Sequence, residues 1–178
     1  MGCGTGQATR SFAERGYAIT AVELGANLIA LAQKNLAQFP KIEFVNEAFE
    51  DWDMQPGTFD LMFAADAFHW IPPQLGYPKA AESLKPGGTV ALFWWVDRRT
   101  DPELSAQIQQ VYDEVAPEFP NPLNGGAATS DFTNEKVHTN VKFAPTLGEP
   151  VVRKYPYPQR ITAEAHLKGL TNFSMHQE

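Results

Sequence analysis

Short, mostly apolar runs alternate with stretches of helical periodicity over the first half of the chain. Ala18–Val22 and Ile42–Val45 have the length and composition of short strands, and Phe59–Ala65, almost uninterrupted in apolar residues, is typical of a strand that is covered on both faces. Thr89–Val96 is a fourth such run, and it follows a turn at Lys85–Gly88. The intervening residues predict helices at Gln7–Arg15, Asn27–Phe39 and Pro72–Leu84. This order of elements is typical of an α/β fold with a mainly parallel sheet.

The second half of the chain has a different pattern. Asp101–Val115 predicts an amphipathic helix, because apolar residues recur on one stripe of it. Residues 116–158 are rich in Pro, Gly and Asn, which predicts an irregular cap containing one strand at Val151–Tyr155. A last short helix is predicted at Thr162–Gly169. We therefore expect two regions, residues 1–116 and residues 117–178.

Two residues are predicted to cap helices. Asn27 precedes the periodic stretch that ends before Pro40, and Thr162 precedes the last predicted helix. Both side chains carry an oxygen that accepts a hydrogen bond from the first free backbone N–H groups of a helix.

The sequence Gly2-Cys3-Gly4-Thr5-Gly6 is the strongest local signal in the chain. Glycines allow a tight turn and let a ligand lie against the main chain, and the helix that follows presents free N–H groups. Glu23 follows the next strand, 17 residues after Gly6, where a carboxylate accepts hydrogen bonds from both ribose hydroxyls. Gln7 stands where the dinucleotide fingerprint requires its third glycine, which disfavours NAD. A plain tight turn is the alternative interpretation.

Composition excludes several classes of function. The 14 basic and 21 acidic residues give a net charge of −7, and no basic run occurs, so we expect no nucleic-acid partner. No apolar stretch approaches the ~20 residues of a membrane span, and no signal peptide is visible, which predicts a cytoplasmic protein without membrane contact. The single cysteine, Cys3, excludes an intramolecular disulfide, and the scattered histidines lack metal-ligand spacing, so no metal site is predicted.

Residues 1–96 resemble class I S-adenosylmethionine-dependent methyltransferases of the small-molecule type 11/type 25 group. The resemblance extends more loosely to residues 155–174. It rests on an ordered set of segments: Gly2-Cys3-Gly4-Thr5-Gly6, Glu23, Glu47-Ala48-Phe49-Glu50, Phe59-Asp60-Leu61-Met62-Phe63, Ala67-Phe68-His69-Trp70 and Leu84-Lys85-Pro86-Gly87-Gly88. It implies a Rossmann-like fold, S-adenosylmethionine as the cofactor, a cofactor-binding domain over residues 1–116, and an acceptor-side cap over residues 117–178.

The resemblance also assigns cofactor contacts. The methionine portion of S-adenosylmethionine would lie along the glycine loop, Glu23 would hold the ribose, and Leu24 would pack on one face of the adenine. The segment Glu47-Ala48-Phe49 would lie at the adenine edge, although the family usually has Asp at the position of Glu47. The full set of implied cofactor-binding residues is Gly2, Cys3, Gly4, Gly6, Glu23, Leu24, Glu47, Ala48, Phe49 and Ala65.

One family feature is missing, because Met1 directly precedes Gly2 where family members have an apolar first strand. That strand is central in the family's sheet, between the second and fourth strands. Its absence leaves two strand edges without partners, at roughly 1–3 kcal/mol for each unsatisfied buried backbone group. No closing pair of strands follows Ser174 either. We therefore expect the chain to be a fragment of a longer protein.

Methyl transfer from a sulfonium requires alignment, exclusion of water and, for an acidic acceptor, a base. His69, just after the third predicted strand, is the candidate base. Asp66 is a candidate contact for the donor's amino group, or is simply solvated. Trp70, Trp94 and Trp95 either line an acceptor pocket or belong to the core.

We therefore predict a methyltransferase that acts on a small-molecule acceptor, with the acceptor and the oligomeric state left open. Two alternatives remain at this point. The chain could be a non-catalytic fragment or partner subunit that keeps the cofactor loop, or a nucleotide-dependent oxidoreductase.

Overall fold

The computed structural model describes residues 1–95, 102–115, 117, 140–158, 160 and 162–170. The chain divides into two compact units. Unit 1 consists of residues 1–96 and 131–150, and unit 2 consists of residues 97–130 and 151–178. The predicted boundary at residue 116 stays a prediction.

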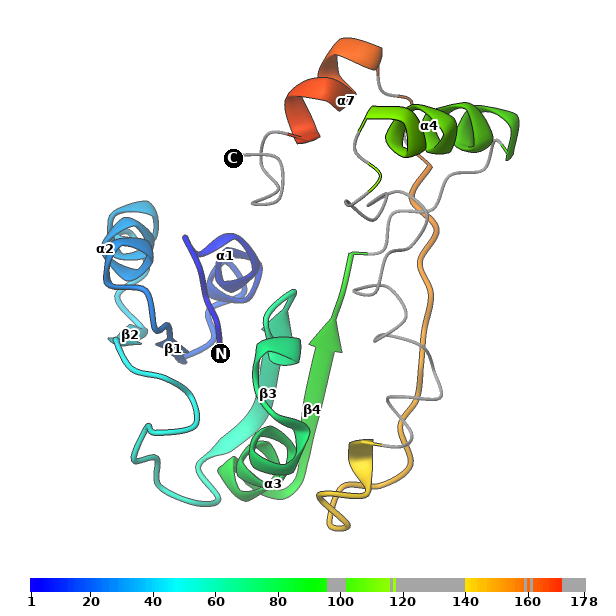
Figure 1. The fold of residues 1–178 in the computed structure, drawn as a ribbon. Coiled ribbons are helices and arrows are strands. Elements are labelled where there is room, and N and C mark those ends of the chain that lie inside the picture. The colour runs from blue at the N-terminus through cyan, green and yellow to red at the C-terminus, as the bar shows by residue number, and fades with distance from the viewer. Residues whose placement is uncertain (96–101, 116, 118–139, 159, 161, 171–178) are drawn as a thin grey trace. The chain divides into compact units, whose positions relative to one another are not determined.

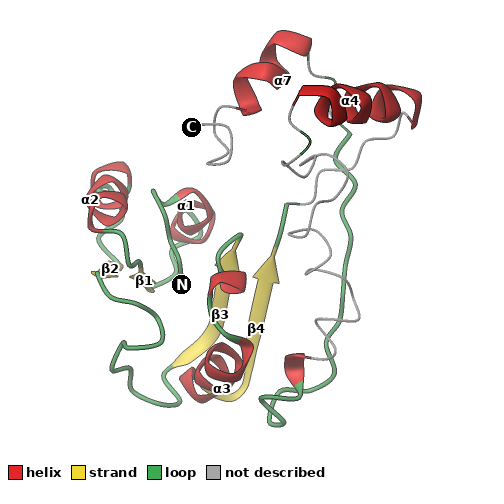
Figure 2. Ribbon diagram, viewed as in Figure 1, coloured by secondary structure: helices red, strands yellow, loops and turns green. Residues whose placement is uncertain are grey.

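Unit 1 is an α/β structure with two pairs of parallel strands (Figures 1 and 2). Strand β1 (Ile19–Val22) pairs with β2 (Ile42–Val45), with Val22 opposite Val45. Strand β3 (Phe59–Ala65) pairs with β4 (Leu84–Phe93), with Ala65 opposite Phe93. The helices of this unit are α1 (Gln7–Ala13), α2 (Ala26–Asn35), the 3-10 helix η1 (Phe68–Trp70) and α3 (Pro73–Ser83). The predicted α/β fold with parallel strands is confirmed.

Strand β4 begins earlier than predicted. Leu84 already lies opposite Phe59, so the segment Lys85–Gly88 is part of the strand and not the turn that precedes it. The pairing register shifts between Phe59 and Leu61, which accommodates the additional residues on β4. Gly87 adopts a φ of 81° within this irregular stretch. A Pro-Gly-Gly sequence therefore marks a bulge here, because pairing with β3 continues on both sides of it.

The predicted Asn27 cap is wrong. Helix α2 begins at Ala26, with Gly25 at its N-cap position, and it ends at Asn35, before the predicted end at Phe39. The amide of Ile29 donates to the carbonyl of Gly25, so helical bonding starts two residues before Asn27. Asn27 is exposed within the helix.

The main hydrophobic core of unit 1 lies around β3, β4 and α3. Most of its buried members come from β3, from η1 and α3 that follow it, and from the loop before β3. The buried members are Phe49, Met62, Ala64, Phe68, Ile71, Tyr77, Ala80 and Ala144. Ala144 comes from the second half of the chain and lies in a turn in which its own amide donates to Val141. Pairing β3 with β4 buries apolar side chains that neither strand could cover alone.

The two strand pairs are separate sheets among the described residues. The segment Met1–Cys3 contacts both of them. The amino group of Met1 donates to the carbonyl of Phe63 on β3 at 2.8 Å, and the amide of Cys3 donates to the carbonyl of Val22 on β1 at 3.2 Å. The Phe12 ring of α1 also stacks on Phe63, with 4.2 Å between ring centroids.

Unit 2 contains two described helices, α4 (Pro102–Val115) and α7 (Ala163–Leu170). The Thr162 cap is confirmed, because the amide of Ala165 donates to Thr162 Oγ1 at 3.1 Å. The strand predicted at Val151–Tyr155 is wrong, since these residues are exposed and in neither helix nor strand. Asp101 and most of residues 116–139 lie outside the described residues. Among the helices that the structure describes, none is long and apolar enough to cross a membrane.

Candidate active site

The residues singled out from the sequence gather where the strands of unit 1 end. Glu23 follows β1, Glu47 follows β2 soon after its last residue, and Asp66 follows β3 directly. In an open α/β sheet, ligands bind outside the carboxyl ends of the parallel strands, because the loops from neighbouring strands converge there.

The glycines of the loop are required for two different reasons. Gly2, Gly4 and Gly6 have φ values of 60°, 53° and 95°, a region that residues with a side chain rarely adopt. A Cβ on Gly2 would lie 2.4 Å from the Cβ of Ala67, and a Cβ on Gly6 would lie 2.7 Å from Leu36 Cδ1. A Cβ on Gly4 would meet nothing within 4 Å. Gly2 and Gly6 therefore permit close packing, whereas Gly4 leaves open space above the main chain.

The carboxylate of Glu23 shapes this loop. The amide of Gly4 donates to Glu23 Oε2, and the amide of Gly25 donates to Glu23 Oε1, both at 2.9 Å. Glu23 thus fastens the glycine loop to the end of β1. Each carboxylate oxygen accepts up to two hydrogen bonds, so both oxygens keep capacity for a ligand hydroxyl.

Asn46 is a site residue that the sequence analysis missed. Its Nδ2 donates to the carbonyl of Glu23 at 2.8 Å and to the carbonyl of Leu24 at 2.9 Å. The end of β2 therefore fixes the backbone that carries Glu23. No local sequence signal identifies this role, because it depends on the parallel pairing of β1 with β2.

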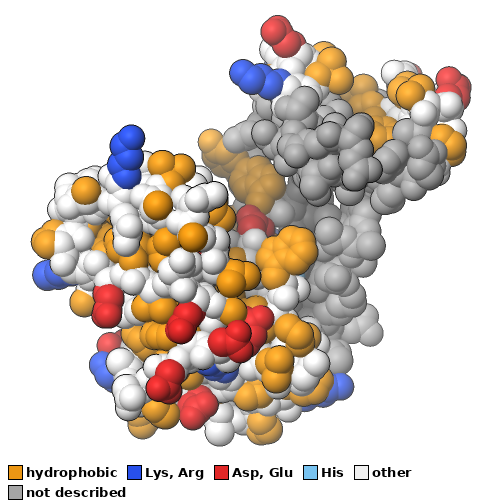
Figure 3. All heavy atoms as spheres, turned by 60° about the vertical axis from the view of Figure 1, so that its left-hand side comes forward, with side chains coloured by type: hydrophobic (Ala, Val, Ile, Leu, Met, Phe, Trp, Pro, Cys, Tyr) orange, Lys and Arg blue, Asp and Glu red, His pale blue; other side chains and the backbone are white. Residues whose placement is uncertain are grey.

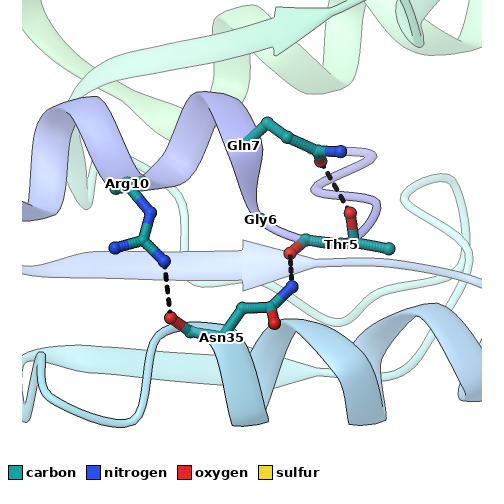
Figure 4. Close-up of a pocket in the computed structure, with 5 residues that line it drawn as sticks. All are labelled: Thr5, Gly6, Gln7, Arg10 and Asn35. Atoms are coloured by element: carbon teal, nitrogen blue, oxygen red, sulfur yellow. Dashed lines mark hydrogen bonds between the residues drawn. The ribbon is translucent and has the colours of Figure 1, made fainter.

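The back of the glycine loop is held by helices α1 and α2. Asn35 Nδ2 donates to the carbonyl of Thr5 at 2.9 Å, and Arg10 donates to the carbonyl of Asn35 at 2.7 Å, at the C-terminal end of α2 (Figure 4). Thr5 Oγ1 donates to Gln7 Oε1 at 2.8 Å. These residues and Gly6 surround a cavity of about 120 Å³. The polar groups at the cavity already bind one another, so they serve to fix the conformation of the loop.

The predicted adenine segment presents mainly its backbone and small side chains. Phe49 is only 5% exposed and belongs to the core, whereas Ala48 is half-buried and Glu47 is exposed. The side chain of Leu24 is 71% exposed at the end of β1. The exposed side chain of Leu24, next to Glu23, is therefore able to pack against one face of a planar ring.

The residues after β3 form the other side of the site. Asp66 has a φ of 48°, which is uncommon for a residue with a side chain and occurs frequently at functional sites. Its amide donates to the carbonyl of Phe93, and its Oδ1 accepts from the amide of Trp95 at 3.0 Å. Asp66 therefore joins the ends of β3 and β4, directly after the predicted contact residue Ala65.

His69 lies in η1, with its ring centroid 5.0 Å from that of Trp70. Partial burial lowers the pKa of His69, although nearby Asp66 opposes the shift. The neutral imidazole is therefore the main form at pH 7, as a base requires. Trp70 and Trp95 are 79% and 61% exposed, whereas Trp94 is half-buried against the main core.

Cys3 does not have the properties of a nucleophile. Burial, together with the nearby charge of Glu23, raises the pKa of its thiol from 9.0 to about 11. The thiol therefore stays protonated at neutral pH. No group of three or more His, Cys, Asp or Glu side chains in the described part of the chain is placed to hold a metal ion.

Comparison with known proteins agrees with this arrangement. Residues 1–88 match the family described as "Methyltransferase domain". Residues 1–88 are a class I methyltransferase domain of the type 25 group. This matched region contains the glycine loop, Glu23, the segment Glu47–Phe49 and His69.

Curated relatives match over the same part of the chain. Trans-aconitate 2-methyltransferase from Deinococcus radiodurans is 34% identical over 96 residues, which are 52% of this chain and 35% of the relative. Ubiquinone biosynthesis O-methyltransferase from Xanthomonas campestris is 32% identical over 95 residues, which are 52% of this chain and 40% of the relative. The methyltransferase domain thus spans well under half the length of these relatives.

Solved structures support the fold over a longer part of the chain. A candidate type II methyltransferase from Anaeromyxobacter dehalogenans aligns with a TM-score of 0.57 at 26% identity, covering 97% of this chain and 68% of the other. A phosphoethanolamine N-methyltransferase from Haemonchus contortus, solved with S-adenosylhomocysteine, aligns with a TM-score of 0.54 at 19% identity. That alignment covers 79% of this chain and 30% of the other.

Proposed function

We propose that this protein is an S-adenosylmethionine-dependent methyltransferase that acts on a small-molecule acceptor. The observation that carries the proposal is the contact between the Gly4 amide and Glu23 Oε2 at 2.9 Å. It places an acid suited to ribose hydroxyls beside a glycine whose Cβ position is open space. This is the chemistry that a nucleoside joined to an amino acid requires: main-chain access for one part and a carboxylate for the other.

The residues of the site fit S-adenosylmethionine. Open space at Gly4 leaves room for the methionine portion, which would pass along the loop from Gly2 to Gly6 and beside Ala65. Glu23 would bind the ribose hydroxyls, and Leu24 would pack on the adenine. Glu47 and the backbone of Ala48 and Phe49 would meet the adenine edge. When bound, the cofactor supplies a methyl group that is activated by a positively charged sulfur.

We assign the role of base to His69. A methyl acceptor that carries a proton must lose it as the new bond forms, and a neutral imidazole near the end of β3 is able to accept it. Asp66 lies three residues away and raises the pKa of His69 against the effect of burial, so it favours the imidazolium that results. Replacement of His69 by Asn should lower turnover and leave cofactor affinity unchanged.

A small molecule is the proposed acceptor. Exposed Trp70 and Trp95 supply apolar surface near the strand ends, and the named relatives are a trans-aconitate 2-methyltransferase and an O-methyltransferase of ubiquinone biosynthesis. Carboxylic acids and hydroxylated rings are therefore the first acceptors to test, with trans-aconitate among them. The net charge of −7 and the absence of a basic run disfavour nucleic acid as a partner.

Calorimetric titration with S-adenosylhomocysteine, with NAD as the comparator, tests the cofactor assignment. We expect the 178-residue chain to bind S-adenosylhomocysteine and not NAD. Binding of NAD alone would replace the proposal with an oxidoreductase function. A folded chain that binds neither compound would favour the non-catalytic alternative.

A further inference from the structure

Lys79 connects helix α3 to the segment predicted to meet adenine. Its ammonium group donates to the carbonyl of Glu50 at 2.7 Å and to the carbonyl of Trp52 at 2.6 Å. The same nitrogen lies 5.8 Å from the centre of the Phe49 ring. One cation thus contacts three residues of a single turn, from a helix whose sequence position is about 30 residues later.

This use of a lysine is unusual, given the charges around it. Lys79 lines a cavity of about 590 Å³ together with four acidic residues: Glu50, Asp51, Asp53 and Glu82. Acidic side chains gather in the lower part of the face drawn in Figure 3. Among the described residues, the structure records no ion pair between Lys79 and any of these carboxylates, and it records two bonds to main-chain oxygens instead. Lys79 therefore binds backbone carbonyl groups instead of pairing with a carboxylate.

The turn itself is held by few other bonds. The amides of Asp51 and Trp52 both donate to the carbonyl of Ala48, at 3.1 and 3.0 Å. Lys79 adds two side-chain hydrogen bonds, to the carbonyls of Glu50 and Trp52, and the Trp52 carbonyl also accepts from the amide of Met54 at 3.0 Å. A charge-assisted hydrogen bond is stronger than a neutral one, so these two contacts dominate the local geometry.

We propose that Lys79 is a positioning residue that fixes the turn Ala48–Trp52 and so determines how this protein recognises adenine. The inference rests on the proposed function, because it takes the backbone of Ala48 and Phe49 to be the adenine edge. Lys79 itself touches no reacting atom. Its contribution is to restrict the turn to one conformation before the cofactor binds, which lowers the entropy lost on binding.

Hydrogen exchange in the free protein tests the positioning directly. In Lys79→Met the apolar stem remains and the donors are lost, so the amides of Asp51 and Trp52 should exchange about tenfold faster, as for the loss of a hydrogen bond worth roughly 1.4 kcal/mol. Lys79→Arg keeps charged donors and should restore most of the protection. Lys85→Met is the matched control, because Lys85 pairs with Asp60 on the exposed surface of the β3–β4 pair. Unchanged exchange in Lys79→Met would overturn the proposal.

Binding then tests the link to adenine. Titrations should compare S-adenosylhomocysteine with S-inosylhomocysteine, in which oxygen replaces the adenine amino group. In Lys79→Met we expect affinity for S-adenosylhomocysteine to fall about tenfold and the preference over the inosine analogue to shrink, with Lys85→Met unchanged within about twofold. An equal loss of affinity for both compounds would overturn the proposal, since it indicates a general effect on the fold. Failure of the wild-type chain to bind S-adenosylhomocysteine would instead remove the proposed function, and this inference with it.

Discussion

The two strand pairs of unit 1 differ in what they contribute. The β1–β2 pair has four-residue strands and carries the glycine loop, Glu23 and Asn46. The β3–β4 pair has strands of seven and ten residues and carries the main core. The residues that we propose to bind the ribose and fix the glycine loop thus lie at the smaller pair, and most of the packing lies in the larger one. The proposed active site includes residues from both pairs, because the candidate base His69 follows β3.

Few contacts join the two pairs, and Phe63 takes part in two of them. Its carbonyl accepts from Met1, and its ring stacks on Phe12 of α1. Gly2 adds a close approach to Ala67, which only a residue without Cβ permits. We therefore expect substitutions at these contacts to destabilise the β1–β2 pair more than the β3–β4 pair.

The largest effect is expected for Phe63→Ala. Loss of the ring removes the contact with Phe12 and should lower the free energy of unfolding by about 3 kcal/mol. Phe59→Ala is the matched control, because Phe59 lies on the same strand but its ring neighbour is Trp52, within the larger pair. Hydrogen exchange should show β1 and β2 opening before β3 and β4 in the first variant only. Equal exchange in both variants would mean that the two pairs form one cooperative unit.

Comparing Gly4→Ala with Gly16→Ala should distinguish an effect on ligand binding from the cost of backbone strain. Gly4 and Gly16 have φ values of 53° and 81°, and a Cβ on either would meet nothing within 4 Å. Both substitutions should therefore cost a similar amount of stability, about 1–2 kcal/mol. Only Gly4→Ala should weaken S-adenosylhomocysteine binding in calorimetry, by more than tenfold, because its methyl group enters the space proposed for the ligand. Equal affinity of the two variants would contradict a cofactor site at this loop.

Glu23→Gln tests the acid with little change of shape. The amide nitrogen of glutamine cannot accept a hydrogen bond, so one of the Gly4 and Gly25 amides loses its partner, at about 1 kcal/mol of stability. Affinity for S-adenosylhomocysteine should fall roughly tenfold, since ribose hydroxyls bind a carboxylate more strongly than an amide. Glu43→Gln, on the exposed side of β2, is the control for a simple change of net charge. If both variants bind alike, Glu23 does not contact the ribose.

At neutral pH the smallest effect is expected at Cys3. Its pKa of about 11 predicts slow alkylation by iodoacetamide at pH 8, at least tenfold slower than in the unfolded chain. Because the pKa of this thiol is raised on folding, its contribution to stability is complete below about pH 9 and is lost as pH rises through 11. Wild-type stability should therefore fall relative to Cys3→Ala over that interval. Parallel pH profiles of the two proteins would show that the thiol is not buried against Glu23.

Local patterns predicted most of the elements of the fold. The bounds of β2 and β3 agree with the predicted runs residue for residue, because apolar residues dominate both segments, although Glu43 and Asp60 are exposed. The predictions failed where pairing outweighs local preference. Lys85–Gly88 reads as a turn but lies in β4, and Val151–Tyr155 reads as a strand but has no partner among the described residues.

The sequence by itself determined the chemistry available to the site. A loop of three glycines, an acid one strand later and a histidine after an apolar strand predict a cofactor site and a candidate base, because each residue type is suited to a particular group. Only the tertiary structure decided what holds these groups in place. Asn46, Lys79 and Asp66 act through hydrogen bonds to backbone atoms of other elements, and the sequence does not show which carbonyl or amide will lie opposite each side chain. Those partners become defined only when the strands pair and the helices pack against them.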